Sequence, residues 1–187
     1  MYNSKKDLIL DAARRVHREA GSSGFSMRKV AASAGMSLGN LQYHFKTKET
    51  LFEGLLNQYM EQYRNRYKEF RKLPLTRETL SVLIKEILKD EASDEDGEIY
   101  RVLYSYAEAG GMSESVMDSY IEELYQILYS LLSYTASPAS ADNVHLACSL
   151  LIPYFESYGL FHGKLGAPIG SIEELLTKTI WELVGPA

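Results

Sequence analysis

A run of polar and basic side chains in the first quarter of the sequence has the chemistry needed to contact a polyanion. Two short stretches with helical spacing, residues 26–34 and 37–45, are separated at Gly35. The second stretch carries Asn and Gln, whose amides can pair with adenine, and Ser, Tyr and His, which can reach phosphate oxygens. This pattern predicts a helix-turn-helix that presents its second helix to the major groove of DNA.

The expected DNA contacts come from the start of the first short helix, the exposed face of the second and the lysines that follow. They are Ser26, Met27, Arg28, Ser37, Leu38, Gly39, Asn40, Gln42, Tyr43, His44, Lys46 and Lys48. Ala31 is small enough for the helix crossing, and Gly35 tolerates the unusual backbone angles of the turn. The alternative is a helical hairpin inside a core, which the polar face and basic flanks of the second helix disfavour.

The charge distribution agrees with an anion-binding N-terminal part. The whole chain of 187 residues has a formal charge of −5, yet residues 1–50 carry nine Lys and Arg against four acids, a net of +5. The remainder therefore carries −10. Such asymmetry predicts an anion-binding end joined to a separate body with another role.

Apolar residues recur at helical spacing along nearly the whole chain, while Gly and Pro separate the helical stretches. We expect an all-α protein of about nine helices. Their approximate bounds are 5–20, 26–34, 37–45, a long helix starting after Thr47 and ending before Pro74, 76–89, 98–109, 113–134, 140–162 and a last helix opened by Ser171. Ser4, Thr47 and Ser171 are the expected N-caps, and Gly21 is expected to end the first helix.

Composition narrows the function classes. Cys148 is the single cysteine, which excludes an internal disulfide and suits a reducing cytoplasm. Four scattered histidines form no ligand cluster, so we expect no metal site and no cofactor. No signal peptide and no membrane-spanning apolar run is visible. Because no catalytic motif such as Gly-x-Ser-x-Gly or a phosphate loop is present, we do not expect an enzyme.

Residues 5–56 resemble the TetR family of bacterial transcriptional regulators. The similarity lies in Ile9–Ala13, Gly21, Ser26–Ala31, Ala34–Ser37, Gly39–Leu41 and His44–Leu51. The resemblance implies a three-helix DNA-binding domain over residues 1–47 and a ligand-binding and dimerisation domain over 48–187. The family usually has Tyr in place of Gln42 and often Thr in place of Met27, so we expect a recognition sequence particular to this protein.

Tyrosines and methionines are dense in the acidic body. The chain has fourteen tyrosines, and this ring combines flat apolar area with one hydrogen bond, which suits a ligand pocket. The candidates are Tyr63, Tyr100, Tyr104, Glu108, Met112, Met117, Tyr120, Tyr154 and Tyr158. With acids nearby the ligand could be cationic or amphipathic, and Glu108 is the first acid to test; an apolar ligand and a packing role for most of these rings remain open alternatives.

The last two helices carry apolar residues that a single chain would leave exposed, and two such helices from each of two chains can form a four-helix interface. The candidates are Leu146, Leu150, Tyr158, Phe161, Leu175, Leu176 and Ile180. We therefore expect a homodimer that binds a palindromic operator in double-stranded DNA and releases it when a small-molecule inducer binds. The alternatives are an activator, or a helical adaptor that acts through protein partners.

Overall fold

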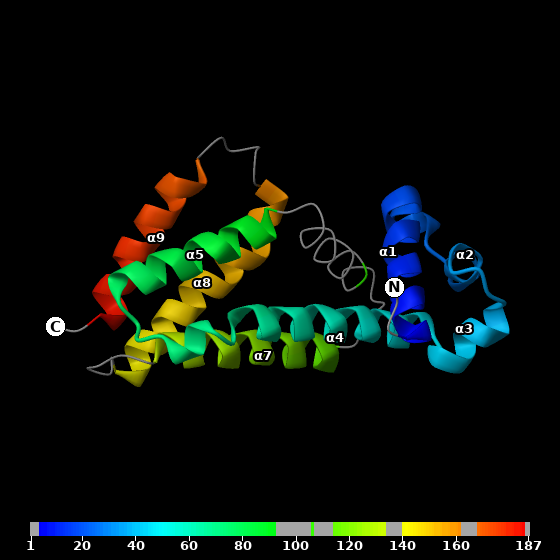
Figure 1. Cartoon of the computed structure of the whole chain (residues 1–187), viewed down its shortest axis with the longest axis horizontal. Helices are drawn as coiled ribbons and strands as arrows, with labels where there is room; N and C mark the ends of the chain where they lie inside the picture. Colours follow the sequence, from blue (N-terminus) through cyan, green and yellow to red (C-terminus); the bar gives the residue numbers. More distant parts are fainter. Residues whose placement is uncertain (1–3, 93–105, 107–113, 134–139, 162–167, 186–187) are drawn as a thin grey trace. The chain divides into compact units, whose positions relative to one another are not determined.

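The computed structural model describes residues 4–92, 106, 114–133, 140–161 and 168–185 (Figure 1). Within these residues all regular secondary structure is helical, which confirms the predicted all-α class. The elements are α1 (Lys5–Gly24), α2 (Met27–Ser33), α3 (Leu38–His44), α4 (Lys48–Tyr67), a 3₁₀ turn (Phe70–Lys72), α5 (Arg77–Glu91), α7 (Glu114–Leu132), α8 (Ala141–Phe161) and α9 (Ile169–Val184). The helix expected at 98–109 lies outside the described residues, apart from Tyr106.

The helix ends follow local capping chemistry. The Ser4 hydroxyl accepts a hydrogen bond from the Asp7 backbone N–H at 3.2 Å, and Thr76 caps α5 in the same way through the Thr79 N–H. Gly21 has a φ of +64°, so the regular part of α1 breaks at the expected residue and one further turn follows. These ends could be predicted because each depends on residues within a few positions of one another.

The start of α9 differs from the prediction. We expected Ser171 to cap this helix, but α9 begins at Ile169, with Pro168 as the N-cap residue. The backbone N–H groups of Ser171 and Ile172 donate to the Pro168 carbonyl at 3.1 and 3.2 Å. The first turn is thus already formed when the chain reaches Ser171, so its side chain has no capping role.

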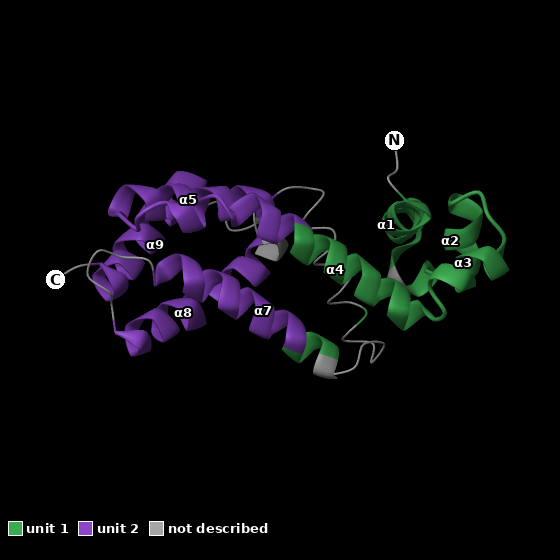
Figure 2. Ribbon diagram, turned by 60° about the horizontal axis from the view of Figure 1, so that its bottom comes forward, with its two compact units in different colours: residues 1–61, 98–118 green, residues 62–97, 119–187 purple. Residues whose placement is uncertain are grey.

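The chain divides into two compact units, residues 1–61 with 98–118 and residues 62–97 with 119–187 (Figure 2). In the first unit α1 packs on α2 and α2 on α3. Its core consists of apolar side chains from all four N-terminal helices: Ile9, Ala12, Ala13, Val16, Val30, Ala31, Leu41, Leu51, Phe52 and Leu55. Small alanines on α1 and α2 allow the close helix contacts that a helix-turn-helix needs.

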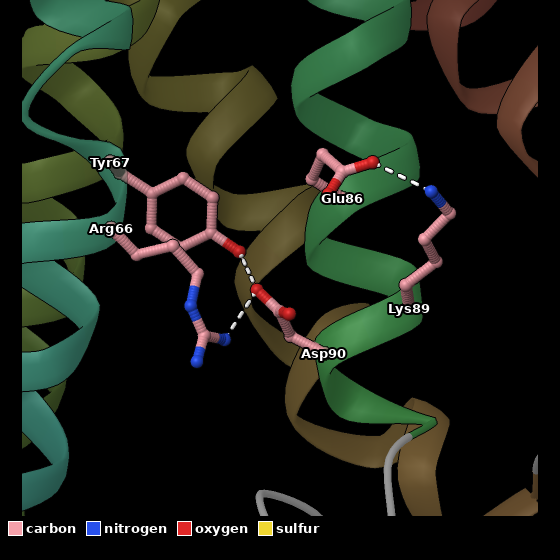
Figure 3. Close-up of polar contacts among 5 residues, drawn as sticks. All are labelled: Arg66, Tyr67, Glu86, Lys89 and Asp90. Carbon is pink, nitrogen blue, oxygen red and sulfur yellow. Dashed lines mark hydrogen bonds and ion pairs between the residues drawn. The ribbon is translucent and has the colours of Figure 1, made fainter.

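In the second unit α5 packs against α8 and α9, and α8 against α9. At one end of α5 the buried Tyr67 hydroxyl donates to the Asp90 carboxylate, and Arg66 pairs with the same carboxylate at 2.7 Å (Figure 3). Burial raises the pKa of Tyr67, so the phenol keeps its proton and acts as donor. These contacts fix the end of α4 to the end of α5. No helix in the described part of the chain is long and apolar enough to cross a bilayer.

Candidate nucleic-acid interface

The two short helices of the first unit are held at fixed positions by their own caps. The Ser26 hydroxyl accepts from the Lys29 backbone N–H at 3.3 Å, and the Ser37 hydroxyl accepts from the Asn40 N–H at 3.2 Å. Between them Gly35 has a φ of +67°, a conformation that glycine adopts without strain. The turn is closed by the Met36 N–H, which donates to the Ala31 carbonyl at 3.0 Å. This geometry is the expected helix-turn-helix.

Burial separates α3 into two faces. Leu41 is fully buried and Phe45, just after the helix, is also buried, so one face anchors α3 to the core. The opposite face is exposed, and the Tyr43 side chain is 85% exposed with its ring edge-on to His44. Ser37, Gly39, Asn40 and Gln42 are exposed as well, while Leu38 and His44 are half-buried. The polar side chains that α3 was predicted to offer to DNA are therefore mostly accessible, while Leu41 and Phe45 anchor the helix to the core.

The basic residues near this face have different roles. Arg28 and Lys46 are exposed and make no hydrogen bond or ion pair with the described residues, so their charges are available to phosphates. Lys29 instead donates to the Gly24 carbonyl at 2.8 Å, and Arg15 donates to the Ser33 carbonyl at 3.1 Å. These two side chains satisfy carbonyls at or near the ends of α1 and α2. Ser26 and Met27 are half-buried where α2 begins.

Lys48 stands apart from the other predicted phosphate contacts. Its ammonium lies over three aromatic rings, 4.9 Å from the Tyr106 centroid, 5.1 Å from that of Phe25 and 5.8 Å from that of Phe52. The rings of Phe52 and Tyr106 are stacked on each other, with their centroids 3.9 Å apart. Burial lowers the pKa of Lys48, and the negative faces of the rings attract its charge. A phosphate contact by Lys48 would therefore have to compete with this aromatic cluster. The cluster could not be predicted from residue spacing, since Tyr106 is distant in the chain.

The N-terminus of α4 is capped as expected. The Thr47 hydroxyl accepts from the Thr50 N–H at 3.1 Å, and the Thr50 hydroxyl accepts from the Thr47 N–H at the same distance. This reciprocal pair satisfies two of the free N–H groups at the point where the helix-turn-helix meets α4.

The candidate pocket residues are only partly described. Tyr100, Tyr104, Glu108 and Met112 lie outside the described residues. Tyr63 and Met117 are half-buried, on α4 and α7 respectively. Tyr154 is half-buried and Tyr158 is buried, with their rings 5.9 Å apart on α8.

The second unit contains a buried carboxyl group that is not among the predicted site residues. Glu156 on α8 is 7% exposed, and the Tyr120 hydroxyl on α7 donates to its two oxygens at 2.9 and 3.0 Å. Burial raises the pKa of Glu156 to about 7, although the Tyr120 hydrogen bond partly opposes this rise. The available signal was weak: Glu156 is the single acid in the apolar second half of α8.

The candidate dimer residues fall into two groups. Leu146, Leu150 and Leu175 are 47%, 50% and 64% exposed in the single chain. Leu176 is half-buried, whereas Tyr158 and Ile180 are buried within the single chain. The side chain of Phe161 lies outside the described residues. Among those that are described, no three His, Cys, Asp or Glu side chains come together in a way that could hold a metal ion.

Comparison with known proteins agrees with this geometry. Residues 9–55 match the sequence model of the bacterial regulatory proteins of the tetR family. Over 186 residues the chain is 31% identical to an uncharacterized HTH-type transcriptional regulator in the dhlA 5′ region of Xanthobacter autotrophicus, covering 96% of this chain and 90% of the relative.

Two solved structures share the fold. A transcriptional regulator from Rhodococcus sp. Rha1 superposes with a TM-score of 0.77 at 19% identity, covering 98% of this chain and all of the other. The multidrug binding protein EbrR complexed with imidazole superposes with a TM-score of 0.70 at 20% identity. The match covers 100% of this chain and 98% of the EbrR chain. With the tetR-family match over residues 9–55 and the similarity to the Xanthobacter regulator along nearly its whole length, the chain belongs to the TetR family of bacterial transcriptional regulators.

Proposed function

We propose that this protein is a homodimeric repressor that leaves a palindromic operator when a small molecule binds its second unit. The observation that carries the DNA-binding part is the exposed polar face of α3, with Tyr43 85% exposed above a fully buried Leu41. The exposed side chains of this face are free to contact a partner such as DNA. Among them, Asn40 and Gln42 carry side-chain amides that can form paired hydrogen bonds with adenine. Arg28 and Lys46 supply flanking charge for the phosphate backbone. The proposed functional division is 1–47 for DNA and 48–187 for ligand and dimer.

The dimer is proposed to form through α8 and α9. Leu146 and Leu150 are one helical turn apart on α8, and Leu175 adds an exposed apolar side chain on α9. Two copies related by a twofold axis would cover these side chains with each other. The same axis would place two α3 helices on half-sites about 34–36 Å apart, one turn of the duplex.

The inducer is proposed to bind in the second unit near the Tyr120–Glu156 pair. Glu156 is a buried carboxyl group whose described hydrogen bonds come from one neutral donor, Tyr120. A ligand with an ammonium group would supply the missing charge. The multidrug binding protein EbrR shares the fold of this chain, which gives a precedent for ligand binding in such a body.

The test of the DNA-binding part is fluorescence anisotropy with a duplex from the promoter of the protein's own gene, at several salt concentrations. Tyr43→Ala should weaken binding by about tenfold, because one lost base or phosphate contact costs about 1–3 kcal/mol. Arg28→Ala should weaken binding and reduce the salt slope by about 0.9. Arg71→Ala removes an equal charge from an exposed site in the second unit and should change neither quantity.

The outcomes distinguish the alternatives. If the unmodified protein binds this duplex no more tightly than an unrelated one, and the three variants behave alike, the operator-binding proposal is wrong and a protein-partner role gains support. A reporter gene behind the same promoter separates repression from activation, since deleting a repressor raises its expression and deleting an activator lowers it.

A further inference from the structure

A surface groove lies in the second unit between α7 and α8. Its volume is about 420 Å³, and most of its lining is apolar. The side chains that matter here are Ile121, Glu122 and Tyr125 from α7 and Ser149, Ile152 and Pro153 from α8. Ile121 is 40% exposed, so the groove offers apolar surface to the solvent in the single chain. Such surface is a candidate for covering by a partner.

Two tyrosines join α7 to α8 beside this groove. The Tyr120 hydroxyl donates to the Glu156 carboxylate at 2.9 and 3.0 Å, and the Tyr125 hydroxyl is hydrogen-bonded to His145 Nδ1 at 3.2 Å. Along α8 the groove residues Ser149, Ile152 and Pro153 fall between His145 and Glu156. The groove is therefore formed by the packing of the single chain, with no partner needed to open it.

The chain's own α9 lies on the opposite side of α8. The Asn143 side-chain amide donates to the Leu183 carbonyl of α9 at 2.9 Å, whereas His145 contacts Tyr125 of α7. Side chains two residues apart on a helix point about 200° apart around its axis. One side of α8 is thus occupied by α9 and the other faces the groove, with the exposed Leu146 between them.

Twofold symmetry directs a second copy to the groove. In a symmetric dimer that buries α8 and α9 of both chains, the four helices alternate around the bundle, so each α8 lies beside its own α9 and beside the partner's. The side of α8 that carries Asn143 is already filled by its own α9. The partner's α9 must therefore approach from the remaining side, toward α7.

The exposed face of α9 complements the groove. Leu175 is 64% exposed, and Lys178, three residues later on the same face, is also exposed. Lys178 is the single basic residue in the sequence of α7, α8 and α9, and it forms no ion pair with the described residues. At the groove the Glu122 carboxylate accepts a hydrogen bond from the neutral Gln126 amide at 2.8 Å, so its charge is not neutralised there.

We propose that α9 of a second copy docks in the α7–α8 groove, with its leucine at position 175 against Ile121 and its lysine at position 178 paired with Glu122. The proposal rests on the homodimer proposed above and extends its interface from α8 and α9 to α7. A second copy fits better than a small molecule, because the apolar surface continues from the groove onto Leu146 and Leu150. A small ligand would leave these leucines uncovered.

Disulfide cross-linking between two different variants tests which helices meet. Both variants carry Cys148→Ala, which removes the single native cysteine. One variant adds Ile121→Cys and the other adds Leu175→Cys; the two are mixed, allowed to exchange subunits and mildly oxidised. We expect the mixture to give at least five times more covalent dimer on a non-reducing gel than either variant alone. Val82→Cys, at an exposed residue of α5, replaces Ile121→Cys as the control and should give no such increase.

Exchange of the two charges tests the ion pair. Glu122→Lys and Lys178→Glu should each raise the dissociation constant of the dimer about tenfold, because two attractive pairs per dimer become repulsive. The double variant restores opposite charges and should return the dissociation constant to near its original value. Glu61→Lys and Lys85→Glu reverse the same charges at exposed positions of α4 and α5 and should leave it unchanged. Analytical ultracentrifugation over a dilution series measures all five variants.

The failure of this proposal can be told apart from the failure of the homodimer. A monomeric unmodified protein would overturn both. If the unmodified protein is a dimer but the mixed variants give no more covalent dimer than each alone, the homodimer stands, docking in the groove is wrong, and the groove is open to another occupant such as a small molecule. If the double charge variant dimerises as weakly as the single ones, the pairing of Lys178 with Glu122 is refuted.

Discussion

Replacing Glu156 by glutamine tests the consequence of burying a carboxyl group between α7 and α8. The amide has nearly the same shape, and its carbonyl still accepts the Tyr120 hydrogen bond, but it carries no charge at any pH. Burial raises the pKa of Glu156 from 4.5 to about 7 in the folded protein. The folded state therefore holds the proton more tightly than the unfolded state does, and the protonated form contributes stability.

The size of the effect follows from the two pKa values. At about 1.36 kcal/mol per pKa unit, the rise to about 7 corresponds to about 3 kcal/mol of unfolding free energy. This contribution is fully present below pH 4.5, falls as the pH increases and is lost above pH 7. Between pH 5 and pH 8 the loss is about 2.5 kcal/mol. Because glutamine does not titrate, the Glu156→Gln variant does not lose this unfolding free energy as the pH rises.

Urea denaturation followed by circular dichroism measures the prediction, at pH 5, 6, 7 and 8 with constant ionic strength and protein concentration. We expect the unfolding free energy of Glu156→Gln, measured relative to that of the unmodified protein, to increase by about 2.5 kcal/mol as the pH rises from 5 to 8. Titration of other groups affects both proteins equally and cancels in the difference. A difference in unfolding free energy that is the same at all four pH values would refute the assignment of a raised pKa to Glu156.

Two other substitutions test the turn and the dimer surface. Gly35→Ala should destabilise the protein by about 1–2 kcal/mol in the same denaturation assay, because its φ of +67° is unfavourable for alanine; Gly39→Ala, in open space inside α3, should instead stabilise it by about 0.5–1 kcal/mol. Leu150→Arg places a charge on the proposed interface and should yield a monomer by light scattering at micromolar concentration, whereas Leu73→Arg, at a comparably exposed leucine, should not. If Leu150→Arg remains a dimer, the α8–α9 interface is wrong.

The helix-turn-helix could be predicted from the sequence because its determinants are local. Ser26, Ser37 and Gly35 each act within a few residues of their own position. The structure places Gly35 at the turn, as expected, and the two serines at the N-caps of the helices that were expected to begin there. The all-helical class follows from the same short-range periodicity. The predicted start of α9 was wrong by three residues because the helix is capped at Pro168 and not at Ser171, and sequence alone does not rank the two.

The body of the protein was harder to predict because its chemistry depends on packing between distant segments. Glu108 was the acid expected to matter, yet the buried one in the described residues is Glu156, whose environment is made by a tyrosine 36 residues earlier. Lys48 was expected to meet phosphate through its position at a helix start. Its aromatic surroundings include a ring from a segment far along the chain, and no spacing rule reveals such a contact.

The stacking of Tyr106 on Phe52 also has a consequence for synthesis. Phe52 leaves the ribosome 54 residues before the ring that covers it. At about 5–20 residues per second, the N-terminal helices remain without this cover for about 3–10 seconds. A nascent chain that ends near residue 61 therefore exposes an aromatic surface beside its newly folded helices, and this period is when it is most open to chaperones or to aggregation.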